Sequence, residues 1–172
     1  TPEKTIYEYE DIKGDPQAVI ANCINPYLTD APDVLLPSRS HPPRGMPAMT
    51  QGNKPVDGGN LILDGVERTA LLTRYPALAP YIKPFIGGYE LLNGGERYCL
   101  WFADASPTEL KAFAQYPEIK ARIEGVKRTR LASPTASVQA QANEPFLFTQ
   151  NRQPQHTFLA VPEVSSERRQ FV

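Results

Sequence analysis

Proline limits the regular structure that this chain can form. Eighteen of its 172 residues are Pro, about twice the ~5% of average usage. A proline has no amide hydrogen and fixes φ, so it ends helices and interrupts strands. Residues 25–60 hold seven of these prolines. We therefore expect a long structured loop region there, and loops of that length inside a compact domain are usually functional.

The first half of the chain shows several short periodic segments between the breakers. Tyr7, Tyr9 and Ile12 alternate with polar residues and predict a strand. Leu61-Ile62-Leu63 predicts another strand. Asp64 after it is a good N-cap for a helix from Val66 to Tyr75. Residues 77–86 have room for one short helical turn before Pro84.

The second half begins with a strong helix signal. Ser106-Pro107-Thr108-Glu109 is a capping box with Pro at the first helical position, and it predicts a helix over 107–115. Pro117 opens a second helix that runs to Leu131. The polar stretch 133–145 predicts a loop. Two further apolar runs predict strands at 146–148 and 157–161. Mixed elements without a βαβ rhythm predict an α+β single domain, with a mixed or antiparallel sheet, a few helices and long Pro/Gly-rich loops.

The segment from Tyr81 to Asp104 has the most distinctive composition. It contains two glycine pairs, Gly87-Gly88 and Gly94-Gly95, where the backbone can turn sharply or approach something large. Residues 97–103 then form an apolar aromatic run typical of a buried strand, and this run includes the only Trp. We expect Trp101 and the Cys99 thiol to lie in the core.

This segment and four others resemble, in the same order, the target-recognition domain of MmeI-like (type IIL/IIG) restriction–modification DNA methyltransferases. The other four are Ile24-Asn25-Pro26-Tyr27-Leu28 with Ala31-Pro32-Asp33-Val34-Leu35, Gly45-Met46-Pro47 with Gly52-Asn53-Lys54-Pro55 and Asp57-Gly58-Gly59, Arg130-Leu131-Ala132-Ser133, and Pro162-Glu163-Val164-Ser165-Ser166-Glu167-Arg168-Arg169. Any one of these segments alone is a weak signal, whereas five in order are specific.

The resemblance implies a part of an enzyme that selects a DNA sequence and has no chemistry of its own. Residues 24–172 would be the DNA target-recognition domain, and residues 1–23 a linker or the tail of a preceding methyltransferase domain. The partners would be double-stranded DNA and that methyltransferase domain. The whole protein would methylate adenine with S-adenosylmethionine and cut DNA with Mg²⁺, and no cofactor is expected in this piece. The chain lacks an initiating Met, which fits an excised fragment.

Composition argues against several other classes of protein. The net charge is −1, which argues against a generic nucleic-acid coat. No apolar run approaches the ~20 residues of a transmembrane helix, so no membrane partner is expected. Two isolated cysteines and two histidines have no disulfide-framework or zinc-site spacing. The cysteine usage predicts a reducing cytosol, and the family resemblance implies that this is the cytoplasm of a bacterium or archaeon.

The cations concentrate in the helix predicted over 117–131. Lys120–Arg130 holds five basic residues and one acidic residue, Glu124. We predict that Lys120, Lys127 and Arg128 contact phosphates and that Arg130 reaches a phosphate or a buried carboxylate. The alternative is an ordinary amphipathic helix with a solvated cationic face and a cation suited to the helix dipole.

Three further groups are candidate DNA contacts. Asn151, Arg152 and Gln153 lie between two predicted strands and have the side chains that read base edges, although a polar turn is the commoner reason for such residues. Arg168 and Arg169 can clamp a phosphate or form a plain surface pair. Lys83 and Arg97 flank the glycine pairs and are plausible phosphate contacts.

Three rival functions compete with DNA target recognition. Asn25-Pro26-Tyr27 is similar to the catalytic Asn/Asp-Pro-Pro-Tyr/Phe motif of amino-methyltransferases, but one Pro is missing and no Gly-rich S-adenosylmethionine turn follows a predicted strand, so a structural turn is favoured. An autonomous enzyme finds no support in nucleophile, metal or phosphate-loop spacing. A protein-interaction or assembly domain, packing through the glycine turns, is the main alternative.

Overall fold

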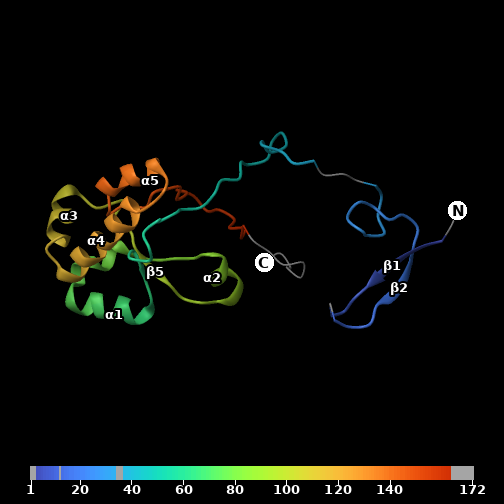
Figure 1. The fold of residues 1–172 in the computed structure, drawn as a ribbon, viewed down its shortest axis with the longest axis horizontal. Coiled ribbons are helices and arrows are strands. Elements are labelled where there is room, and N and C mark those ends of the chain that lie inside the picture. Colours follow the sequence, from blue (N-terminus) through green and yellow to red (C-terminus); the bar gives the residue numbers. More distant parts are fainter. Residues whose placement is uncertain (1–2, 12, 34–36, 164–172) are drawn as a thin grey trace. The chain divides into compact units, whose positions relative to one another are not determined.

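The structure is a computed structural model that describes residues 3–11, 13–33 and 37–163. The chain divides into two compact units, Thr1–Met49 and Thr50–Val172, and each is described by itself. Figure 1 follows the elements along the chain. The predicted boundary at residue 24 falls inside the first unit, and the predicted arginine pair Arg168 and Arg169 lies outside the described residues.

The first unit contains a β-hairpin followed by a turn. Strands β1 (Lys4–Glu8) and β2 (Gln17–Ala21) pair antiparallel, with Lys4 opposite Ala21 and Glu8 opposite Gln17. The strand predicted around Tyr7 is confirmed, although it ends before Tyr9, and Ile12 lies outside the described residues. The second strand was not predicted.

The turn after β2 is held by the side chain of Asn25. This residue is buried, and its Oδ1 accepts hydrogen bonds from the amides of Tyr27 (2.9 Å) and Thr29 (3.1 Å). The Leu28 amide donates to the Asn25 carbonyl at 3.0 Å, and Leu28 takes a positive φ of 59°. This Asx-type turn agrees with the structural interpretation of Asn25-Pro26-Tyr27.

The second unit is built on a small antiparallel sheet. Its strands are β3 (Ile62–Leu63), β4 (Ile82–Pro84) and β5 (Tyr98–Leu100), in the order β3-β5-β4. Ile62 lies opposite Cys99, and Ile82 lies opposite Leu100. The predicted strand at 97–103 is thus present but shorter, and β4 was not predicted. Strands and helices together make an α+β fold, as predicted.

Three helices begin where local signals placed them. Helix α1 (Gly65–Arg74) is capped by Asp64 with a capping box to Glu67, and α3 (Pro107–Phe113) is capped by Ser106 with a box to Glu109. Helix α4 (Pro117–Leu131) begins at its proline. The turn expected before Pro84 is a 3₁₀ helix, η1 (Pro76–Tyr81).

Several predictions that lacked a local signal are wrong. The predicted loop at 133–145 contains helix α5 (Ala136–Ala140) and the 3₁₀ helix η2 (Gln141–Asn143). Both pack against α4, so tertiary contact rather than sequence period stabilises them. Helix α2 (Gly88–Asn93) was missed. No strand forms at 146–148 or 157–161 within the described residues.

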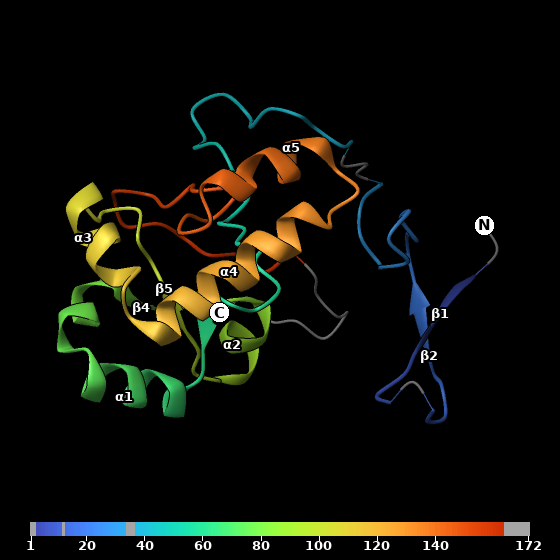
Figure 2. The same cartoon turned by 60° about the vertical axis from the view of Figure 1, so that its left-hand side comes forward.

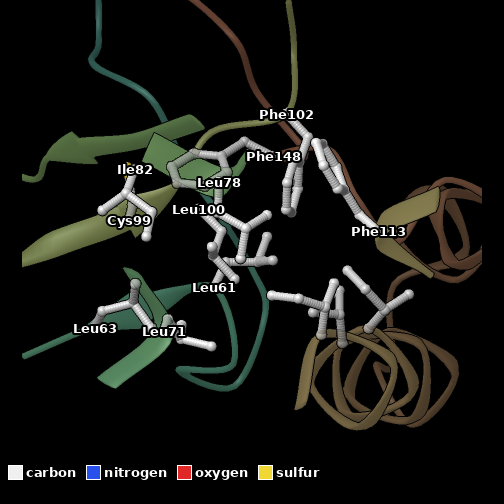
Figure 3. Packing of buried hydrophobic residues seen from close by; sticks show 13 residues of the cluster. Leu61, Leu63, Leu71, Leu78, Ile82, Cys99, Leu100, Phe102, Phe113 and Phe148 are labelled. Atoms are coloured by element: carbon white, nitrogen blue, oxygen red, sulfur yellow. The ribbon is translucent and has the colours of Figure 1, made fainter. Parts of the chain in front are cut away.

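The core lies between the sheet and the helices (Figure 3). Leu61, Leu78 and Leu100 are fully buried there, together with Phe102 and Phe113. The run at 146–148 joins this core through its rings instead of through strand pairing. The Phe146 and Phe102 ring centroids lie 5.6 Å apart, and those of Phe148 and Trp101 lie 5.1 Å apart.

Two sequence expectations concern single core residues. Cys99 is buried as expected, and burial raises the pKa of its thiol to about 11. Trp101 is only half-buried, because it packs at the edge of the core against Phe148.

Helix α4 is the longest element and packs between α1 and α5 (Figure 2). Its Arg122 forms an ion pair with Glu67 of α1 and donates to the carbonyls of Asn60 (3.0 Å) and Ile62 (3.2 Å). Gly125 permits close approach, since a Cβ built there would lie 2.2 Å from the Asn60 side-chain oxygen. These contacts fix α4 against the segment that enters β3.

The core assignment predicts different costs for two leucine truncations. Leu100→Ala removes a fully buried side chain and should lower the free energy of unfolding by about 2–5 kcal/mol. The matched control Leu131→Ala, on the exposed face of α4, should change it by less than about 0.5 kcal/mol. Urea unfolding followed by Trp101 fluorescence measures both. Equal effects would contradict the assignment.

Candidate nucleic-acid interface

The five cations of α4 divide into two structural arginines and three exposed side chains. Arg122 is half-buried and paired, and Arg130 is buried. The side chains of Lys120, Lys127 and Arg128 are exposed and form no hydrogen bond or ion pair with the residues that the structure describes. These three cations are therefore available to an external anion.

The exposed cations share one side of the helix. Lys120 and Lys127 are seven residues apart, so they lie nearly in line, about 10.5 Å apart along the axis. Arg128 projects about 100° further around the helix axis than Lys127, so the three cations span an arc of about 100°. Glu124 is exposed between them and is the one carboxylate on this face. A short row of cations on a chain of net charge −1 is suited to docking on phosphates without indiscriminate coating.

Arg130 has a different role from the predicted one. Its side chain is only 1% exposed, so it contacts no solvent-borne phosphate, and no carboxylate receives its hydrogen bonds. Instead, Nε donates to the Val56 carbonyl (3.1 Å), Nη1 donates to the carbonyls of Gln141 and Glu144 (both 3.0 Å), and Nη2 donates to those of Pro55 (3.0 Å) and Leu147. Arg130 binds main-chain carbonyls rather than a phosphate or a carboxylate because it lies on the apolar side of α4, between irregular segments.

Burial affects the pKa of Arg130. Loss of water lowers the pKa of Arg130, while the nearby carboxylates of Asp57 and Glu144 oppose that change. A guanidinium stays protonated in proteins and has five N–H donors, and here five main-chain carbonyls receive them. Arg130 therefore joins residues 55–56 to residues 141–147.

Next to this junction, two short extended segments, 51–54 and 149–153, lie side by side. Lys54 and Gln150 exchange main-chain hydrogen bonds at 3.0 and 3.1 Å, and the Thr149 hydroxyl donates to the Lys54 carbonyl at 2.9 Å. Side chains add further bonds between Asn53 and Gln153 and between Gln51 and Arg152. The teal and orange-red parts of the ribbon in Figure 1 contain these segments.

The candidates Asn151, Arg152 and Gln153 thus lie in a different setting from the predicted hairpin tip. All three are exposed, but no strands flank them, and their neighbour is a segment about a hundred residues earlier. Sequence reasoning missed Gln51 and Asn53 as members of this surface. The available signal was their amide side chains next to the Gly52 and Pro55 breakers.

The remaining candidates flank the glycine pairs. Lys83 is exposed on β4. Arg97 binds Glu90 with two hydrogen bonds, from Nε to Oε1 (2.6 Å) and from Nη2 to Oε2 (2.8 Å), and its guanidinium lies 5.2 Å from the Phe85 ring centre. Hydrogen bonding from Arg97 lowers the pKa of Glu90 to about 2. Because a buried carboxylate already balances Arg97, its predicted phosphate contact stays a prediction.

Known proteins resemble this chain in sequence and in architecture. Residues 30–172 match the family model described as MmeI, target recognition domain. This chain belongs to the MmeI target recognition domain family. As a member of that family, it is 38% identical over 149 residues to DNA methyltransferase A of Bacillus subtilis (strain 168), which covers 87% of the chain and 17% of that relative.

A solved structure agrees with this assignment. The type IIL restriction-modification enzyme MmeI in complex with DNA matches 90% of this target recognition domain with a TM-score of 0.72 and 39% identity, over 20% of its own length. The chain therefore spans about a fifth of the length of these relatives. The predicted family and its target-recognition role are confirmed.

The Glu90–Arg97 pair predicts an acid-sensitive contribution to stability. In the folded state the pKa of Glu90 is about 2, below its ordinary 4.5. The stabilisation that the ionised Glu90 gives to the folded state is therefore complete above about pH 5 and is lost as the pH falls towards 2. Glu90→Gln should therefore be less stable than wild type near neutral pH, and the difference should shrink towards pH 2. Urea unfolding from pH 7 to pH 2 measures it. A difference that stays constant with pH would contradict the assignment.

The Arg130 junction predicts a large asymmetry between two arginines of α4. Arg130→Met removes five hydrogen bonds to main-chain carbonyls and leaves those of Pro55, Val56 and Leu147 without a donor among the described residues, so it should cost about 3 kcal/mol or more. Arg128→Met is the matched control, two residues away and exposed, and should cost less than about 0.5 kcal/mol. Thermal or urea unfolding compares them, and similar stabilities would show that the junction contributes little.

Proposed function

We propose that this chain docks on double-stranded DNA and contributes sequence recognition to an adenine-specific DNA methyltransferase with endonuclease activity. The observation that carries the proposal is the face of α4 with three exposed cations, Lys120, Lys127 and Arg128, whose side chains have no partner among the described residues. The family, and a family structure described as a complex with DNA, support the same ligand.

In this mechanism phosphates and bases are contacted by different side chains. The exposed cations of α4 neutralise phosphates and set the position of the domain on the duplex, which carries no sequence information. The polar residues Asn151, Arg152 and Gln153 lie on the same unit and have the donors and acceptors that read base edges. Lys83, Arg97, Arg168 and Arg169 are additional candidate contacts.

The chemistry would belong to the rest of the protein. We propose that a methyltransferase domain of the parent chain binds S-adenosylmethionine and flips the adenine, and that Mg²⁺ supports DNA cleavage in a nuclease domain. Within the described residues, no three His, Cys, Asp or Glu side chains are grouped to hold a metal ion. A cytoplasmic location in a bacterium or archaeon belongs to the same proposal, because the named relative is bacterial.

A protein-interaction role is favoured by one other surface. Ile86, Tyr89 and Leu92, on and beside α2, are 68%, 66% and 47% exposed. The paired charges of Glu90 and Arg97 leave little net attraction for phosphate there. This surface is suited to a neighbouring protein domain, and such a contact is compatible with DNA docking through α4.

None of the helices in the described part of the chain has both the length and the apolar character needed to span a bilayer.

Duplex binding at two salt concentrations tests the phosphate contacts. The triple variant Lys120→Ala/Lys127→Ala/Arg128→Ala should bind at least tenfold more weakly at low salt. The slope of log K against log salt should become shallower by roughly 2–3, because each lost phosphate contact removes about 0.9. A triple variant with the affinity and salt slope of wild type would contradict the proposal.

Two matched variants control for charge in general. Lys111→Ala removes an exposed cation from α3 and should leave binding within about twofold. Glu124→Gln removes the carboxylate among the α4 cations and should tighten binding to every duplex. If Lys111→Ala weakened binding as much as Lys127→Ala, net charge rather than the α4 face would be responsible.

A further inference from the structure

We infer that segments 51–54 and 149–153 form one two-stranded base-reading element, which Arg130 positions without contacting DNA. The readers are polar side chains of both segments, the exposed Gln51, Arg152 and Gln153 and the half-buried Asn53. The inference rests on the proposed function and deepens it, because it assigns specificity-determining residues to a segment that lies about a hundred residues before Arg152.

The main chain fixes the register of the element. The reciprocal hydrogen bonds between Lys54 and Gln150, at 3.0 and 3.1 Å, place the two chains antiparallel at this point. The Thr149 hydroxyl adds a bond of 2.9 Å to the Lys54 carbonyl. The major groove of B-form DNA admits two paired extended segments, and this single bridge pairs the two segments at their base.

The side chains beyond that bridge bind one another across the two segments. Asn53 Nδ2 donates to Gln153 Oε1 at 2.8 Å, and Asn53 Oδ1 accepts from the Arg152 amide at 2.6 Å. Arg152 Nη1 donates to Gln51 Oε1 at 3.2 Å. Each reader group is therefore held near its neighbour before DNA arrives, which limits the rotamer entropy lost on binding.

These bonds can be exchanged for base edges at little cost. These three hydrogen bonds lie at the surface of the protein, and a surface hydrogen bond adds little net stability because water competes for it. Arg pairs with the O6 and N7 of guanine, and Asn or Gln pairs with the N6 and N7 of adenine. The element thus presents one guanine reader and three adenine-type readers.

Arg130 holds the base of this element. Its guanidinium binds the carbonyls of Pro55 and Val56, directly after Lys54, and the carbonyl of Leu147, two residues before Thr149. Both segments therefore leave the same buried junction. Since Arg130 is 1% exposed, it acts as a positioning residue.

The test is selection of binding sites from a randomised duplex library with wild type, Gln51→Ala, Asn53→Ala, Arg152→Ala and the control Lys127→Ala. Wild type should enrich a short sequence. Each reader variant should lose roughly tenfold or more of the preference at one or two base pairs. Gln51→Ala and Asn53→Ala, which remove no charge, should keep the wild-type salt slope and the wild-type affinity for a scrambled duplex. Lys127→Ala should weaken binding to all sequences alike.

Arg130→Lys tests the positioning role. This substitution keeps the positive charge but loses the planar guanidinium and its five N–H donors. It should therefore weaken the base preference at the same base pairs as Asn53→Ala and Arg152→Ala. The salt slope should stay at the wild-type value, since no phosphate contact is removed. A folded Arg130→Lys protein, checked by Trp101 fluorescence, that keeps the full preference would overturn the positioning role. If that variant does not fold, the reader variants still decide the assignment.

The outcomes separate this inference from the proposed function. Wild type that binds duplexes in a salt-dependent way but enriches no sequence, or Asn53→Ala and Gln51→Ala variants with the wild-type preference, would overturn the reading element and leave phosphate docking in place. Wild type that binds no duplex at low salt would overturn both.

Discussion

The buried guanidinium of Arg130 is the interaction on which the irregular half of this domain depends. A buried charge is tolerated only when its donors are matched, and here five main-chain carbonyls match them. Those carbonyls belong to residues 55–56 and 141–147, which lie outside any sheet, and among the described residues only the carbonyls of Gln141 and Glu144 also accept a local main-chain amide. One side chain of the longest helix therefore gives order to a proline-rich segment and to a late loop at once.

Helix α4 combines three roles. Ile119, Ile123 and Val126 enter the core. Arg122 binds the carbonyl of Asn60, just before β3, and Arg130 binds the carbonyl of Gln141, where η2 begins. The remaining cations point to solvent. Because the same helix anchors the surrounding loops and presents the cations, the distance between phosphate contacts and the neighbouring loops is set by a rigid element, as accurate docking requires.

Sequence reasoning succeeded where the signal was local. The capping boxes at Asp64 and Ser106 and the proline at 117 determine helix starts within a few residues, and the family resemblance was specific. It failed for β4 and α5, which exist because they pair with β5 and pack against α4, and these contacts leave no local pattern in the sequence. Arg130 shows the same limit, because its place on the apolar stripe was visible but the carbonyls that receive its donors were not. The pairing of Asn53 with Gln153 has no sequence signature.

The central claim is that one DNA duplex contacts both the exposed face of α4 and the paired segments 51–54 and 149–153. An NMR titration of the isotope-labelled chain with short DNA at low salt tests this claim most directly. We expect the largest shift changes for the side-chain amides of Asn53 and Gln153 and for the backbone of Lys120, Lys127 and Arg128, with one common affinity. Changes confined to α2 and the glycine pairs, or two sets of residues titrating with different affinities, would contradict a single DNA-docking surface.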